Sequence, residues 1–136
     1  MTKQQCQLCG EFSMEHTSKE TEYRYKGHSI IVEQPGEYCE ACGEAMLGPK
    51  DLSATRKQLA EFKAEVDHLL SPAEIRKIRR RLKLTQLAAA RICGGGKNAF
   101  SRYESGEVLI PRAASNLLMI LSNHKELMDE IKQEVA

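Results

Sequence analysis

Residues 85–106 read Thr85-Gln86-Leu87-Ala88-Ala89-Ala90-Arg91-Ile92-Cys93-Gly94-Gly95-Gly96-Lys97-Asn98-Ala99-Phe100-Ser101-Arg102-Tyr103-Glu104-Ser105-Gly106. A short alanine-rich helix pattern is interrupted by three glycines, and a second short helix pattern ends at Ser105-Gly106. Two short helices joined by a tight turn are the sequence form of a helix-turn-helix. We therefore expect the second helix to enter the major groove of DNA.

Two polar residues on this second helix are suited to reading bases. Asn98 and Arg102 are four residues apart, so they share one helix face. Asparagine reads adenine and arginine reads guanine, each through two hydrogen bonds. An alternative without base reading stays open, in which Asn98 only caps the helix and Arg102 contacts phosphate, since many protein–DNA contacts are made to the backbone.

The neighbouring residues divide between DNA and core. We expect Lys97 and Ser101 to contact phosphates, and Gln86 to do so at the start of the first helix, which Thr85 can cap. Phe100 and Tyr103 face elsewhere, towards the core, and Glu104 is expected to be structural. Cys93, beside the glycine turn, is expected to be a small buried hydrophobe.

A basic helix is expected directly before this stretch, from Pro72 to Leu82. Ser71 is a suitable N-cap, with Pro72 at the first helical position and Glu74 at the third. The apolar positions fall on one face, and cations fill the others: Arg76, Lys77, Arg79, Arg80, Arg81 and, just beyond the helix, Lys83. Such a run is usually a solvated face. Here some of its members should meet phosphate, but not all, because they point around the helix.

The near-neutral net charge of +1 hides two halves of opposite sign. Residues 1–70 carry 8 Lys and Arg against 12 Asp and Glu, whereas residues 71–136 carry 12 against 7. A basic half next to an acidic half suggests a nucleic-acid surface in the second half. The length of 136 residues allows one domain or two small ones.

The N-terminal half contains two matched CxxC pairs, Cys6/Cys9 and Cys39/Cys42, each followed by glycine and separated by 29 residues. This is the ligand pattern of a structural zinc ribbon with one Zn²⁺ ion. A closed four-thiolate site has no open position, so it stabilises a fold and does not catalyse. Rubredoxin-like iron remains an alternative, because tetrahedral sulfur geometry suits both metals. His16 and His28 are expected at the surface, since four cysteines already fill the site.

The segment between the cysteine pairs has strand character. We expect two or three antiparallel strands within residues 22–38, with turns at Lys26-Gly27 and Pro35-Gly36. A helix should follow over 50–69, with a narrow apolar stripe of Leu52, Leu59, Phe62, Val66 and Leu69. The fold class is therefore a small α+β zinc-ribbon-like domain, residues 1–68 with the linker helix, and an all-α helix-turn-helix domain, residues 69–136.

Two further helices are expected after the helix-turn-helix, over residues 112–122 and 127–135, which makes five in the C-terminal domain. Their apolar residues could form the core or a dimer interface, since helix-turn-helix domains usually act as two-fold dimers. The sequence shows no secretory signal or membrane-spanning run, so we expect a cytoplasmic protein. No set of residues suggests nucleophilic catalysis, and we expect no enzyme activity.

These motifs together resemble a known family. The two cysteine pairs, the Tyr38-Cys39 lead-in, the Leu84-Thr85-Gln86 start and the stretch from Gly94 to Glu104 are similar to the MqsA (YgiT-type zinc-finger) type II antitoxins with an Xre-like helix-turn-helix. The resemblance covers nearly the whole chain. Residues of the cysteine pairs, the strands and the linker depart from the family pattern.

The resemblance implies a zinc domain that binds an MqsR-like, mRNA-cleaving toxin, and a C-terminal domain that dimerises and represses its own operon at a palindromic operator. It implies that Asn98 and Arg102 read the operator bases. The toxin of that family is basic, which fits the acidic N-terminal half. The alternative is a stand-alone zinc-containing transcription regulator without a toxin partner.

Overall fold

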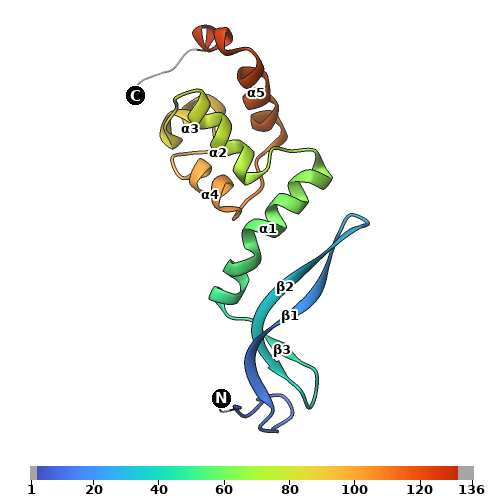
Figure 1. Cartoon of the computed structure of the whole chain (residues 1–136). Helices are drawn as coiled ribbons and strands as arrows, with labels where there is room; N and C mark the ends of the chain where they lie inside the picture. Colours follow the sequence, from blue (N-terminus) through green and yellow to red (C-terminus); the bar gives the residue numbers. More distant parts are fainter. Residues whose placement is uncertain (1–2, 132–136) are drawn as a thin grey trace. The chain divides into compact units, whose positions relative to one another are not determined.

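The computed structural model describes residues 3–131 of the chain. These residues form two compact units, which meet between Arg56 and Lys57, and helix α1 (Pro49–Asp67) runs from the first unit into the second (Figure 1). A small sheet characterises the first unit, and helices make up the second.

The sheet of the N-terminal unit has the order β1-β2-β3. Strand β1 (Met14–Tyr25) pairs antiparallel with β2 (His28–Cys39), and the short β3 (Ala45–Met46) pairs with the end of β2. The predicted turn at Lys26-Gly27 is confirmed. Both residues have positive φ, 48° and 82°, which is the backbone of a two-residue hairpin turn that follows the twist of the strands.

The predicted turn at Pro35-Gly36 is wrong, because both residues lie inside β2, opposite Ser18 and Thr17. Hydrogen-bonded and non-hydrogen-bonded pairs alternate along an antiparallel hairpin, and the pair next to the two-residue turn, Tyr25 and His28, is hydrogen-bonded. The pair of Ser18 and Pro35 is therefore non-hydrogen-bonded, so the missing N–H of Pro35 costs no bond to β1. A Cβ on Gly36 would collide with the Leu47 side chain. The glycine thus serves close packing within a strand instead of a reversal of the chain.

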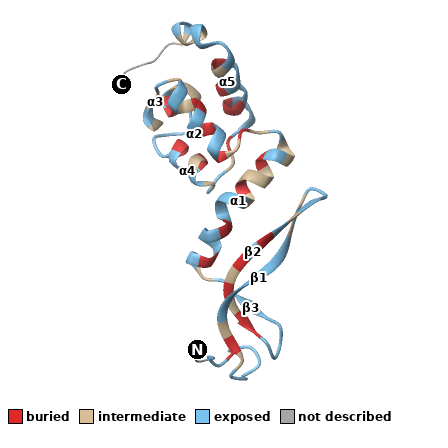
Figure 2. Cartoon of the chain, in the orientation of Figure 1, coloured by how far each residue is buried: buried red, intermediate tan, exposed pale blue. Residues whose placement is uncertain are grey.

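Buried positions of the hairpin lie along β2 from its middle to its last residue, and at the first residue of β1 (Figure 2). Cys6, Met14 and Cys39 form one cluster. Val32 and Tyr38 are also buried. With so few large apolar side chains, hydrophobic burial alone gives this unit little stability.

A polar network holds the first turn of α1 on the hairpin. Asp51 Oδ1 lies 2.7 Å from His16 Nε2 of β1, and Asp51 Oδ2 accepts a 2.9 Å hydrogen bond from the Gly48 amide before the helix. Asp51 therefore caps its own helix and bonds the sheet at once. His16, expected at the surface, is exposed, but it also takes part in this bond.

The same network continues through two buried side chains. Gln34 Nε2 donates to the Asp51 carbonyl at 2.9 Å, and Thr55 Oγ1 donates to Gln34 Oε1 at 2.9 Å. Tyr38 Oη closes the group by donating to the Gln34 carbonyl at 2.7 Å. Buried polar groups that are fully paired fix one packing geometry, because any other leaves a group unsatisfied.

Helix α1 buries a different face from the one predicted. Its buried residues are Asp51, Thr55, Ala60 and Ala64, whereas Leu52 of the predicted apolar stripe is 52% exposed. Leu59, Phe62 and Val66 are only partly buried. The apolar spacing predicted a helix correctly, but the docked face of its first half was decided by hydrogen bonding to the sheet.

The C-terminal unit contains α2 (Pro72–Arg81), α3 (Gln86–Cys93), α4 (Ala99–Ser105), α5 (Arg112–Asn123) and the 3₁₀ helix η1 (Lys125–Glu130). The predicted capping box of Ser71 and Glu74 is confirmed, and so is the cap of α3 by Thr85. Helices α2, α3, α4 and α5 share one core, which contains Leu70, Ile75, Ile78, Ala89, Ala90, Ala99, Phe100, Tyr103, Ile110, Ala114 and Leu118.

The last part of the chain differs from its prediction. Instead of an α-helix over 127–135, the structure has η1, and residues 132–136 lie outside the described part. The predicted count of five helices for the C-terminal domain is not confirmed, because residues 3–131 contain six helices, of which α1 extends into the C-terminal unit and η1 is a 3₁₀ helix. In that same range, none of the helices is long and apolar enough to cross a membrane.

The bond between His16 and Asp51 predicts a pH-dependent stability. The hydrogen bond that His16 makes to the Asp51 carboxylate raises the pKa of His16 above 6.5. The bonds from the Gly48 amide and from His16 lower the pKa of Asp51 below 3.8. The contribution of His16 is complete below pH 6.5 and is lost as the pH rises through its folded-state pKa; that of Asp51 is complete above pH 3.8 and is lost as the pH falls through its folded-state pKa.

We therefore expect His16→Gln to destabilise the N-terminal unit most between about pH 4 and 6.5, and less once the pH has risen through the folded-state pKa of His16. The readout is the denaturant midpoint followed by tyrosine fluorescence. The control is His28→Gln, since His28 is exposed at the start of β2. An equal difference from the unchanged protein at pH 5.5 and pH 9 would contradict the charged bond.

Candidate metal centre and nucleic-acid interface

The two CxxC segments fold into nearly identical turns. The Gly10 amide donates to the Cys6 carbonyl at 2.9 Å, and the Gly43 amide donates to the Cys39 carbonyl at 2.9 Å. Both glycines have left-handed φ angles, 82° and 77°, which explains the residue type that follows each pair. The turns therefore present their sulfurs in the same way.

The hairpin brings the two turns together. In its register Met14 lies opposite Cys39, so both cysteine pairs reach the same end of the sheet. The sulfurs of Cys6, Cys9, Cys39 and Cys42 all lie within 4.8 Å of one another. Among the described residues, no other group of three or more His, Cys, Asp or Glu side chains lies close enough together to hold a metal ion.

The sulfur spacing fits a tetrahedral metal ion. Cys6 Sγ lies 3.8 Å from Cys42 Sγ, and Cys9 Sγ lies 3.7 Å from Cys39 Sγ. A regular tetrahedron with Zn–S distances of ~2.3 Å has sulfur–sulfur edges of ~3.8 Å. The four cysteines are therefore arranged to hold one metal ion, in a closed site without a position for substrate.

The thiols themselves favour a cation. The amides of Cys9 and Leu8 lower the pKa of the Cys6 thiol to about 7. The Glu44 amide acts in the same direction on Cys42, but desolvation and the three neighbouring thiols outweigh it and raise the pKa of Cys42 to about 12. Four sulfurs this close repel one another as thiolates. A divalent ion removes the repulsion and lets all four ionise.

The glycine turn between α3 and α4 has an unusual backbone. Gly94, Gly95 and Gly96 all have positive φ, 85°, 99° and 86°. A Cβ on Gly95 would lie 3.0 Å from the Ala99 Cβ and 3.1 Å from the Tyr103 hydroxyl. The turn thus needs glycine both for its backbone and for close contact with α4.

Helix α4 buries one face and exposes the other, as predicted. Phe100 and Tyr103 are 0% and 7% exposed, and their rings meet edge-on with centroids 5.3 Å apart. Lys97, Asn98, Ser101 and Arg102 are all exposed. Both candidate base readers are therefore accessible to a ligand, and so are two of the three predicted phosphate contacts.

Asn98 occupies the N-cap position of α4, but its side chain makes no capping hydrogen bond there. Its φ and ψ, −99° and 1°, also differ from the extended backbone of Thr85 at the start of α3. The alternative interpretation, in which the Asn98 side chain caps α4, thus has no support in this conformation. Gln86, the third predicted phosphate contact, is partly buried at the first position of α3, while Thr85 Oγ1 accepts from the Ala88 amide.

A buried ion pair positions α4. Arg79 Nε donates to Glu104 Oε2 at 2.8 Å, and Arg79 Nη2 donates to Glu104 Oε1 at 2.9 Å. Their side chains are 13% and 7% exposed, and Arg79 Nη1 also donates to the Leu84 carbonyl. The structural role predicted for Glu104 is confirmed. Its partner was not predicted, because Arg79 looks like its neighbours in the basic run.

Cys93 lies outside the sulfur cluster and packs against the C-terminal core. It is partly buried, and burial raises the pKa of its thiol to about 11. Cys93 packs against the core as predicted, but it is partly buried and not fully buried. Its thiol is a poor nucleophile, because the thiolate form is disfavoured.

Known proteins match this chain across both the four-cysteine cluster and the glycine turn followed by α4. The family model for the "antitoxin component of bacterial toxin-antitoxin system, MqsA" matches residues 4–132. Antitoxin MqsA of Escherichia coli (strain K12) is 35% identical over 129 residues, which is 93% of this chain and 98% of that protein. The match spans the four cysteines, the glycine turn and α4. The chain belongs to the MqsA family of antitoxins of bacterial toxin–antitoxin systems.

Proposed function

We propose that this antitoxin binds and neutralises an MqsR-like, mRNA-cleaving toxin through its N-terminal domain and represses its own operon through its helix-turn-helix. One observation supports this proposal above the others. The family match over residues 4–132 includes both the cluster of four cysteine sulfurs and helix α4 with its exposed Asn98 and Arg102. The protein is a binding protein without catalytic activity, and it acts in the cytoplasm.

In this proposal Cys6, Cys9, Cys39 and Cys42 hold one structural Zn²⁺ ion. The sulfur spacing supports a tetrahedral ion, and a redox-inert metal suits a protein whose function is binding. When bound, the metal supplies folding free energy to a unit with a small core. The functional domains are residues 1–68, which bind the toxin, and residues 69–136, which bind DNA and dimerise.

The proposed DNA contacts follow from α3 and α4. Asn98 and Arg102 read operator bases from one exposed face, while Lys97, Ser101 and Gln86 hold phosphates. Two copies related by a two-fold axis present two such helices to a palindrome. The C-terminal domain supplies the dimer interface, and α5 exposes Met119 and Ile120 for this contact.

Arg102→Ala should remove operator discrimination without unfolding the protein, because its side chain is exposed. Loss of one bidentate base contact corresponds to roughly 5- to 150-fold in discrimination. Gel-shift titration should compare the region upstream of its own gene with a scrambled duplex. Lys97→Ala is the matched control and should weaken binding to both duplexes about equally. Unchanged discrimination by Arg102→Ala would exclude base reading by this residue.

Chelation of the metal should unfold residues 1–48 and leave the C-terminal helices intact, because the C-terminal unit has its own core. Cys42→Ser should have the same effect, since it removes one ligand. Cys93→Ala should keep one zinc ion per chain. Metal analysis and circular dichroism provide the measurements, and loss of all helical signal on chelation would contradict two independent domains.

Toxin binding can be tested with the full chain carrying an affinity tag and co-expressed with its neighbouring gene. We expect a small basic ribonuclease to co-purify, because residues 1–70 carry more acidic than basic side chains. Cys42→Ser should abolish co-purification if the zinc-folded domain holds the toxin. Operator discrimination without any co-purifying partner would favour the alternative, a stand-alone transcription regulator.

A further inference from the structure

The cations of α2 divide into separate groups around the helix. Arg79 is committed to Glu104, and Arg81 Nη1 donates to Ser122 Oγ of α5 at 3.2 Å. Arg76, Lys77 and Arg80 are exposed on the side away from buried Ile75 and Ile78. Within α2, these three cations have no side-chain partner among the described residues.

These three cations line a groove of about 520 Å³ between α2 and the middle of α1. Its lining residues are Lys57, Ala73, Arg76, Lys77 and Arg80. No carboxylate contributes to the lining, and within residues 3–131 none of the four cations forms an ion pair. Four unneutralised positive charges around one concave surface create a field that attracts anions.

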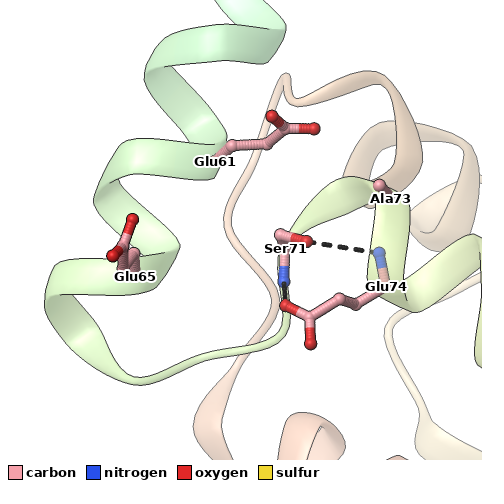
Figure 3. Close-up of a pocket in the computed structure, with 5 residues that line it drawn as sticks. All are labelled: Glu61, Glu65, Ser71, Ala73 and Glu74. Carbon is pink, nitrogen blue, oxygen red and sulfur yellow. Dashed lines mark hydrogen bonds between the residues drawn. The ribbon is translucent and has the colours of Figure 1, made fainter.

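A second groove, of about 350 Å³, lies next to the first and carries the opposite charge. Figure 3 shows Glu61 and Glu65 on α1 and Glu74 in the first turn of α2, where Glu74 and Ser71 bond each other. Ala73 lines both grooves, so the sign of the charge changes across this residue. An anionic chain is thus attracted to the basic groove and repelled from its neighbour.

We propose that the groove of Lys57, Arg76, Lys77 and Arg80 binds the phosphate backbone of DNA, as a site separate from the helix-turn-helix. This inference rests on the DNA binding proposed above. The buried Arg79–Glu104 pair joins α2 to α4, so the groove keeps a fixed position relative to the reading helix. A phosphate held in the groove then helps to set the orientation of α4 without reading sequence.

The spacing of the cations suits a phosphodiester chain. Arg76 and Arg80 are four residues apart on one stripe, which is about 6 Å along the helix axis. Successive phosphates of one DNA strand are a comparable distance apart, because six backbone bonds join one phosphorus atom to the next, so the two arginines can meet neighbouring phosphates. Arginine also binds phosphate through its planar set of donors, whereas an isolated lysine acts as a point charge.

The test is the salt dependence of DNA binding by the full-length, zinc-loaded double variant Arg76→Gln/Arg80→Gln. Each lost phosphate contact reduces the slope of log Kobs against log salt by about 0.9, so the loss of two contacts from each copy of the proposed dimer should reduce the slope by roughly 3.6. Discrimination between the upstream and scrambled duplexes should stay unchanged. The control Lys50→Gln/Lys125→Gln removes the same charge from exposed positions outside the groove and should keep the original slope.

Different outcomes separate this inference from the proposed function. A slope equal to that of the control would overturn the groove as a DNA site, even if Arg102→Ala still loses discrimination. Absence of DNA binding by the unchanged protein would overturn both. A third arm uses inorganic polyphosphate: if Arg76→Gln/Arg80→Gln weakens its binding but leaves the DNA slope unchanged, the groove binds another polyanion and the DNA assignment is wrong. Circular dichroism confirms that each variant is folded.

Discussion

The convergence of four cysteine sulfurs is the constraint on which the N-terminal unit depends. A hairpin with 12-residue strands and a two-residue turn fills most of the 29 residues between Cys9 and Cys39. Its register places Met14 opposite Cys39, which returns the chain to the first cysteine pair. The buried cluster at that point consists of Cys6, Met14 and Cys39, so the metal site and the small core are one structure. Loss of an ion held by the four sulfurs would therefore disturb the centre of this core as well.

Features set by local chemistry could be predicted from the sequence. The Lys26-Gly27 turn depends on two backbone conformations, and the caps at Ser71 and Thr85 depend on bonds within three residues. Features set by distant partners could not. Pro35-Gly36 looks like a turn until β1 lies beside it, and no local pattern shows that His16 meets Asp51, 35 positions away.

The candidate site shows the same division. Helical periodicity placed Asn98 and Arg102 on the exposed face of α4 and Phe100 and Tyr103 in the core. The roles of the α2 cations were harder to predict, because they are all Lys or Arg and differ only in their angular position around the helix. The structure assigns Arg79 to an ion pair and Arg81 to a hydrogen bond with α5. Charge counting predicts a basic surface, but only packing shows which charges remain for a ligand.

The position of α4 results from steric and electrostatic contacts on its two sides. On the turn side, Gly95 approaches Ala99 and Tyr103 so closely that a side chain there would displace the helix. On the α2 side, Glu104 is held by two hydrogen bonds from Arg79 in a nearly buried setting. A charge left alone in that setting costs several kcal/mol, so the pair resists separation. Base reading requires side chains placed to within a fraction of an ångström. A seven-residue helix cannot hold that position through its own hydrogen bonds, since isolated helices this short are not stable. The precision of the proposed DNA reader is therefore a property of its buried face.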